Sequence, residues 1–226
     1  MKGTAMKKSQ KGFTLVEIAI VLVIIGLLLG GILKGQEMIT QAKIKNVIAD
    51  VTGVSAAMYG YQDRYRALPG DDKGAGRWAG GPAVPASAGN GVIEGAYGSA
   101  NAADESRLFW DHLRRAGFVG GQGTENPFNA VSGKMGVQTG DGSSATPPGV
   151  LGTAANTQLF TGLILCSANL PDKIAISVDS QMDDGQGKTG SVRALKGGAN
   201  PALPSTGAAD DYTEDGVSTY VICRQM

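Results

Sequence analysis

The order of apolar and polar positions predicts a long N-terminal helix that begins inside a membrane. Residues 13–33 are almost entirely apolar and carry a single charge, on Glu17. At about 1.5 Å per residue, a helix of this length spans about 30 Å, which is the thickness of a bilayer's hydrocarbon core. The run therefore predicts a membrane-spanning helix.

The apolar pattern then changes to that of an amphipathic helix. Apolar residues recur at steps of three and four, with polar residues between them: Ile44, Val47, Ile48, Val51, Val54, Met58, Tyr61, Tyr65 and Leu68. This spacing places them on one helix face. Pro69 disfavours helical geometry at the preceding residue and Gly70 favours a turn. We expect the helix to continue to about residue 66, with another element covering its apolar stripe.

The rest of the chain predicts a small sheet in a glycine-rich setting. Glycine accounts for 35 of the 226 residues, about twice the usual 7%, which indicates long loops. Residues 104–117 predict a short helix. Strand-like segments occupy residues 159–165, 173–178, 191–195 and 217–223. An antiparallel sheet packed on the long helix is the arrangement that covers the stripe, so the expected fold class is α+β.

The charges flanking the apolar run predict its orientation. Four lysines precede the run and no acid does: Lys2, Lys7, Lys8 and Lys11. The positive-inside rule places such a flank in the cytoplasm and the rest of the chain across the membrane. A secretory signal would have a shorter apolar region and a cleavage site beyond it, whereas this run continues into an amphipathic helix. Cleavage on the far side is not expected.

Residues 11–17, Lys-Gly-Phe-Thr-Leu-Val-Glu, resemble the processing motif of the type IV prepilin family. This family includes type IV pilins and type II secretion pseudopilins. The resemblance implies that a membrane-embedded aspartyl peptidase cuts after Gly12 and methylates Phe13. It also implies a long helix packed on a C-terminal sheet, and filament assembly through that helix.

Glu17 needs a compensating partner, because a carboxylate in a membrane-spanning helix is costly to insert. The resemblance implies that this partner is the N-terminal ammonium of a neighbouring subunit, so that an ion pair sets the axial register of a filament. The alternative is an interfacial glutamate among lipid headgroups with no role in assembly.

These observations divide the chain into a leader (1–12), a transmembrane and assembly segment (13–33), an amphipathic segment (34–66) and a globular head (67–226). The precursor has 20 basic and 20 acidic residues. Removal of the leader's four lysines leaves 16 basic residues against 20 acidic ones. A mature chain with this balance does not favour binding to nucleic acid.

Cys166 and Cys223 each lie at the end of a strand-like segment in the part expected to cross the membrane. An oxidising compartment favours a disulfide between them, with two buried free thiols as the alternative. Pilins often carry a disulfide that bounds their C-terminal region, so the resemblance points the same way.

Acidic residues gather in the C-terminal part of the head. Asp179, Asp183 and Asp184 precede Gly185, and four more acids follow: Asp210, Asp211, Glu214 and Asp215. Calcium binds six to eight such oxygens, and the resemblance implies a calcium loop because major pseudopilins of type II secretion have one in this region. The spacing is not that of an EF-hand, and Asp-Gly is also a turn signal. Calcium binding and plain turn formation both stay open.

No catalytic signature is found, and no cofactor other than calcium is suggested. The one histidine, His112, has no partner of a catalytic pair nearby, so we expect it at the surface or boundary of the short helix. The sequence therefore predicts a structural filament subunit and not an enzyme. Its expected partners are other copies of itself, a prepilin peptidase, an inner-membrane assembly platform and membrane lipid.

The expected location is the inner membrane, with one spanning helix, a cytoplasmic N-terminus and a periplasmic head, followed by a filament in the periplasm or at the cell surface. The alternative function is a membrane-tethered binding module or minor tip pilin that recognises a surface, DNA or a secreted protein.

Overall fold

The structure is a computed structural model that describes residues 12–143, 148–154, 157–197, 203 and 207–226. The leader lysines Lys2, Lys7, Lys8 and Lys11 lie outside the described residues. The chain divides into two compact units, Met1–Gln41 and Ala42–Met226. We call them the N-terminal unit and the C-terminal unit.

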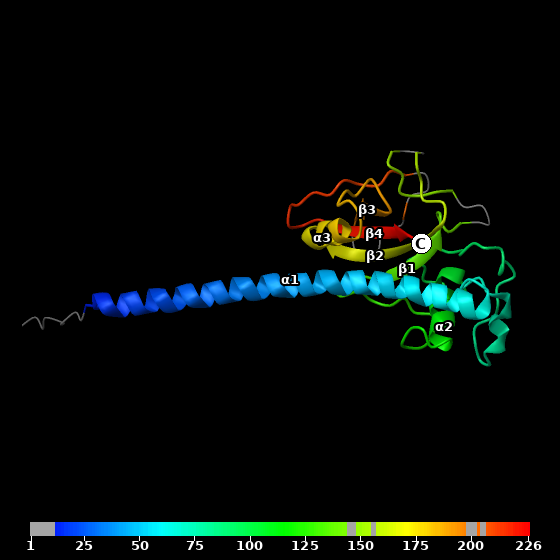
Figure 1. The fold of residues 1–226 in the computed structure, drawn as a ribbon, viewed down its shortest axis with the longest axis horizontal. Helices are drawn as coiled ribbons and strands as arrows, with labels where there is room; N and C mark the ends of the chain where they lie inside the picture. Colours follow the sequence, from blue (N-terminus) through cyan, green and yellow to red (C-terminus); the bar gives the residue numbers. More distant parts are fainter. Residues whose placement is uncertain (1–11, 144–147, 155–156, 198–202, 204–206) are drawn as a thin grey trace, which may run out of the picture. The chain divides into compact units, whose positions relative to one another are not determined.

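Helix α1 runs from Leu15 to Tyr65 and belongs to both units (Figure 1). In the N-terminal unit its large apolar side chains are exposed, from Ile25 at 46% to Leu15 at 88%. Within the described residues, α1 is the one helix long and apolar enough to cross a membrane. This exposure is consistent with a single-pass membrane anchor, because apolar side chains need no protein partner in hydrocarbon.

In the C-terminal unit, α1 has the apolar stripe that its sequence predicts. The buried positions recur at steps of three and four: Ile44, Val47, Val51, Val54, Ala57, Met58 and Tyr61. The helix ends at Tyr65, slightly before the expected end, and Arg66 adopts a left-handed conformation with φ of 55°. The left-handed conformation of Arg66 ends the helix three residues before Pro69, which disfavours helical geometry at Leu68.

The sheet of the described residues has four antiparallel strands in the order β1-β2-β4-β3. Their bounds are Met135–Thr139 for β1, Leu163–Pro171 for β2, Val192–Lys196 for β3 and Thr219–Gln225 for β4. The expected α+β class and antiparallel sheet are confirmed. β3 and β4 lie close to the predicted segments, β2 begins later than the predicted 159–165, and β1 lies outside all four predicted segments.

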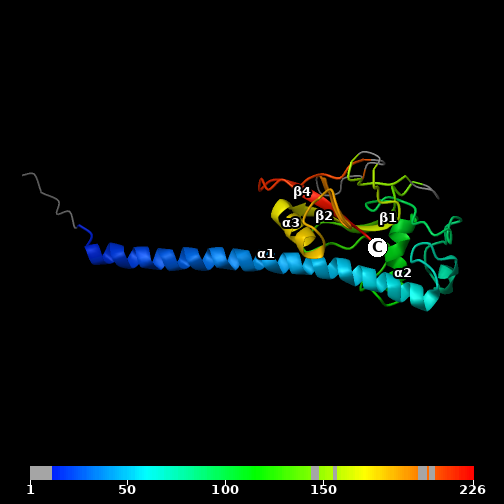
Figure 2. The same ribbon diagram turned by 45° about the horizontal axis from the view of Figure 1, so that its top comes forward.

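The sheet buries both of its faces. One face packs on α1, as in Tyr220 and Ile222 of β4, which lie in one cluster with Ile44 and Val47. The opposite face buries Val221 and Cys223 with residues of the connecting loops, such as Leu151 and Phe160. Figure 2 shows these loops on the far side of the sheet from α1. Successive strand residues point to opposite faces, which explains the alternation along β4.

The predicted strand over residues 173–178 is wrong, because this segment lies in helix α3, Asp172–Met182. Ile174, Ala175 and Val178 are buried on one side of α3, at helical spacing. A short apolar run fits a strand or a helix equally well by its period. Pro171 is both the last residue of β2 and the N-cap of α3, so the helix begins directly where the strand ends.

Helix α2, Glu105–Arg115, is the predicted short helix, and a 3₁₀ helix spans Lys73–Arg77. The expected surface position of His112 is wrong, because this residue is only 4% exposed. Its ring stacks on Tyr61 with centroids 6.2 Å apart, and its Nδ1 accepts a hydrogen bond from the Gly70 amide. This contact joins residues far apart in sequence, so no local pattern could indicate it.

Candidate functional site

The predicted cleavage junction lies in non-helical, exposed chain. Residues 12–14 precede α1, Gly12 is exposed and Phe13 is 84% exposed. A Cβ atom at Gly12 would meet no atom of the described residues within 4 Å. The peptide bond after Gly12 thus lies outside helix α1, and a larger residue at position 12 causes no clash with the described part of the chain.

Thr14 and Glu17 form a capping box at the start of α1. The Thr14 amide and hydroxyl both donate to Glu17 Oε2, at 2.8 and 2.9 Å, and the Glu17 amide donates to Thr14 Oγ1 at 3.3 Å. These bonds satisfy amide groups that the first helical turn leaves without partners. The sequence analysis missed this role, although Thr-x-x-Glu is its known signature.

The capping box leaves part of the carboxylate for another contact. Both bonds from Thr14 reach Oε2, and among the described residues no donor bonds Oε1 of Glu17. Cleavage after Gly12 would create an ammonium group on Phe13, directly before Thr14. One carboxylate can thus cap its own helix and still accept an ammonium group at the same depth in the membrane.

Cys166 and Cys223 form a disulfide in the structure. They lie directly opposite each other on β2 and β4, with Cα atoms 4.0 Å apart, and both are fully buried. Their sulfur atoms belong to the core on the loop-covered face of the sheet. The bond therefore ties the last strand of the chain to the sheet.

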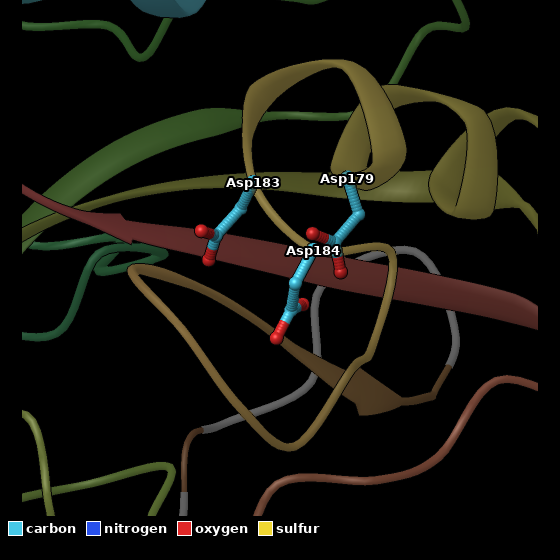
Figure 3. Close-up of side chains that lie close together, drawn as sticks. All are labelled: Asp179, Asp183 and Asp184. Atoms are coloured by element: carbon cyan, nitrogen blue, oxygen red, sulfur yellow. The ribbon is translucent and has the colours of Figure 1, made fainter.

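Asp179, Asp183 and Asp184 meet where α3 leads into the turn before β3 (Figure 3). One oxygen from each can lie within 4.8 Å of the others. Each carboxylate accepts hydrogen bonds from neighbouring residues. The donors are Tyr212 and Gly185 for Asp179, Ser191 and Val192 for Asp183, and Gln186 and Thr189 for Asp184.

These hydrogen bonds show that the three aspartates stabilise the turn between α3 and β3. Among the described side chains, only Asp183 Oδ1 in this cluster accepts no hydrogen bond. Five of the six carboxylate oxygens thus already accept hydrogen bonds, whereas calcium binds six to eight oxygens. Burial raises the pKa of Asp179 to about 6, with Asp184 and Asp183 adding to the rise and the bonds from Tyr212 and Gly185 opposing it. Calcium at this turn stays a prediction.

Burial lowers the pKa of His112 to about 4, from an ordinary value of 6.5. Asp72 and Asp111 oppose this shift, while Arg77 and Arg115 add to it. Between pH 6.5 and 4 the folded state thus binds fewer protons than the unfolded state, so stability is full above pH 6.5 and falls on acidification. Over this window His112 is expected to lower the free energy of unfolding by up to about 3 kcal/mol.

The variant His112→Asn tests this expectation, because its side-chain oxygen can still accept from the Gly70 amide. Urea unfolding of both proteins from pH 7.5 to 4 should give curves that converge at acidic pH. The raised pKa of Asp179 acts in the opposite direction, but it contributes to both proteins and cancels in their difference. Parallel curves would show that His112 does not change its charge state on unfolding.

Comparison with known proteins identifies the N-terminal segment. Residues 7–33 match the family model of the prokaryotic N-terminal methylation motif. No curated protein and no solved structure matches the chain. The matched motif is the class III signal peptide of type IV pilin-like proteins, which confirms the resemblance of residues 11–17. The match covers the N-terminal segment alone, and it supports a precursor of the type IV pilin or pseudopilin kind.

Proposed function

We propose that this protein is a structural subunit of a type IV pilus-like or type II secretion pseudopilus filament. It is inserted in the inner membrane with its N-terminus in the cytoplasm and its head in the periplasm. A prepilin peptidase cleaves it after Gly12 and methylates Phe13. The mature chain then polymerises through its N-terminal helix on an inner-membrane assembly platform.

The observation that carries this proposal is the arrangement of the matched motif. Its Gly12–Phe13 bond is exposed and lies just before the first turn of α1, and Glu17 lies within that turn. The exposed apolar surface of α1 in the N-terminal unit supports insertion in lipid before assembly and helix packing afterwards.

Processing is expected to occur between Gly12 and Phe13. Co-expression with a prepilin peptidase followed by intact-mass measurement should show a chain that begins at methylated Phe13. Gly12→Val should leave the full precursor in the membrane, because a branched side chain replaces the small residue at the cut. This variant should fold normally, since nothing lies within 4 Å of a Cβ at position 12.

Gly35→Val is the matched control, because a Cβ at Gly35 also meets no atom within 4 Å and the change is far from the junction. It should be processed like the parent. A mature chain that begins at another residue, or a parent that stays uncut beside an active peptidase, would contradict the proposal.

A further inference from the structure

The C-terminal end of α2 borders two adjoining cavities of about 450 and 520 Å³. Both are lined by Asp111, Arg115 and Gly123. Glycine-rich loops form the remaining walls, and both cavities are open to solvent. The residues that line them all lie outside the matched motif of residues 7–33.

Arg114 lines the first cavity and is held by main-chain groups only. Its Nη1 donates to Gly123 O at 2.7 Å, and its Nε donates to Gly120 O at 3.4 Å. No carboxylate of the described residues forms an ion pair with it, and no described acceptor bonds its Nη2. The guanidinium group is thus fixed in place with one terminal nitrogen left to donate.

Arg115 lines both cavities and is fixed in a similar way. Its Nε donates to Asp111 Oδ2 at 2.6 Å, and its Nη2 donates to Gly80 O at 3.2 Å. Among the described residues, no acceptor bonds its Nη1. Asp111 is buried, with 2% of its side chain exposed, and is committed to this ion pair.

The charges around the cavities leave an excess of one positive charge. Arg114 and Arg115 face a single lining acid, Asp111. Glu125, the acid on the adjacent loop, pairs instead with Arg107 at 2.7 Å. Two fixed guanidinium groups with spare donors favour an oxyanion, because charge-assisted bonds to carboxylate or phosphate are the strongest that arginine makes.

The second cavity adds an uncharged surface beside these donors. Pro82, Ala83, Ala102 and Ala103 line it with small apolar side chains. We propose that the two cavities form one binding site for a small molecule that carries a carboxylate or phosphate on a compact neutral body, such as an acidic sugar. Arg114 and Arg115 hold the acid group, and the body lies against the small apolar side chains.

Glucose and two acidic derivatives of it, all with the same ring size, test the ligand class. Glucuronate supplies a carboxylate, glucose 6-phosphate supplies a phosphate, and glucose is the neutral control. Calorimetric titration of the full, uncleaved chain in nonionic detergent should show binding of one or both acidic sugars, weaker at higher salt, and no binding of glucose. This assay needs neither cleavage nor assembly, so its outcome is separate from that of the proposed function.

Two substitutions test the site itself. Arg114→Gln should raise the dissociation constant about tenfold, because it removes a charged donor. Gln122→Glu should also weaken binding, because it adds a negative charge to the exposed wall without changing side-chain size. Arg64→Gln on α1 is the control and should bind like the parent. If Arg114→Gln fails to fold, Gln122→Glu decides the test.

Absence of binding of either acidic sugar at millimolar concentration to the folded parent would overturn the proposal. Binding of glucose as tight as that of the acidic sugars would overturn the charge argument. If Gln122→Glu and a folded Arg114→Gln both bind the acidic sugars like the parent, the site lies elsewhere. Binding of only one acidic sugar would support the site and identify which oxyanion it prefers.

Discussion

Glu17→Gln subunits are expected to enter the membrane and to be cleaved, yet to be missing from filaments. The substitution removes the negative charge and retains a side-chain oxygen that can cap α1. It makes the helix easier to insert, because an amide is less costly in hydrocarbon than a carboxylate. It also leaves Gly12 intact, so the peptidase still finds its junction.

Assembly should fail because the ammonium group of Phe13 loses its partner. Breaking one side of a buried ion pair costs about 3–5 kcal/mol, since the remaining charge is uncompensated. A loss of that size at every subunit contact should lower the polymerised fraction by more than about tenfold. Glu17 Oε1, which accepts no bond from the described residues, is the atom available for this pair.

The control variant is Thr14→Ala, which removes the capping box and keeps the carboxylate. It should polymerise like the parent if the charge serves assembly, and fail if Glu17 matters only as a cap. The assay compares sheared filaments with the membrane pool in cells without wild-type subunits. Efficient polymerisation of Glu17→Gln in such cells would show that Glu17 is an interfacial residue, as the alternative reading holds.

Removal of the disulfide is expected to lower the free energy of unfolding of the C-terminal unit by about 4 kcal/mol. The bond closes a loop across a sequence separation of 57 residues, and in the chain-entropy model closure of such a loop restricts the unfolded state by about this amount. The variant Cys166→Ala/Cys223→Ala tests this without placing a hydroxyl group in the buried core. Urea unfolding can be followed by the fluorescence of Trp78 and Trp110.

Val221→Ala separates the cross-link from packing. Val221 lies in the same core cluster as the two cysteines, and its truncation removes two carbon atoms but no covalent bond. It should cost about 2 kcal/mol. If Cys166→Ala/Cys223→Ala loses no more stability than Val221→Ala, the covalent bond adds little beyond the packing of the two cysteine side chains in the core.

Local patterns predicted the helices in which apolar residues repeat over several turns or in which acidic and basic residues mark the two ends. The stripe from Ile44 to Tyr61 repeats over several turns, and α2 begins with acidic and ends with basic residues, so both helices were found. The prediction of a strand over residues 173–178 was wrong because the few apolar residues of α3 fit the period of a strand and that of a helix equally well. The helix is selected by the buried cluster that it joins, which also contains Ile44 and Val47 from a distant part of the chain.

The amino-acid pattern alone was enough for the N-terminal features of this protein: the apolar run, the basic flank, the methylation motif and the acid at position 17. These features follow one another within the first 33 residues, so their order and spacing can be read directly from the sequence. Only the tertiary structure decided the rest. It buried His112 against Tyr61, joined Asp179 to Tyr212 and brought Arg115 to Gly80. Such contacts depend on how distant segments pack, and no local pattern encodes them.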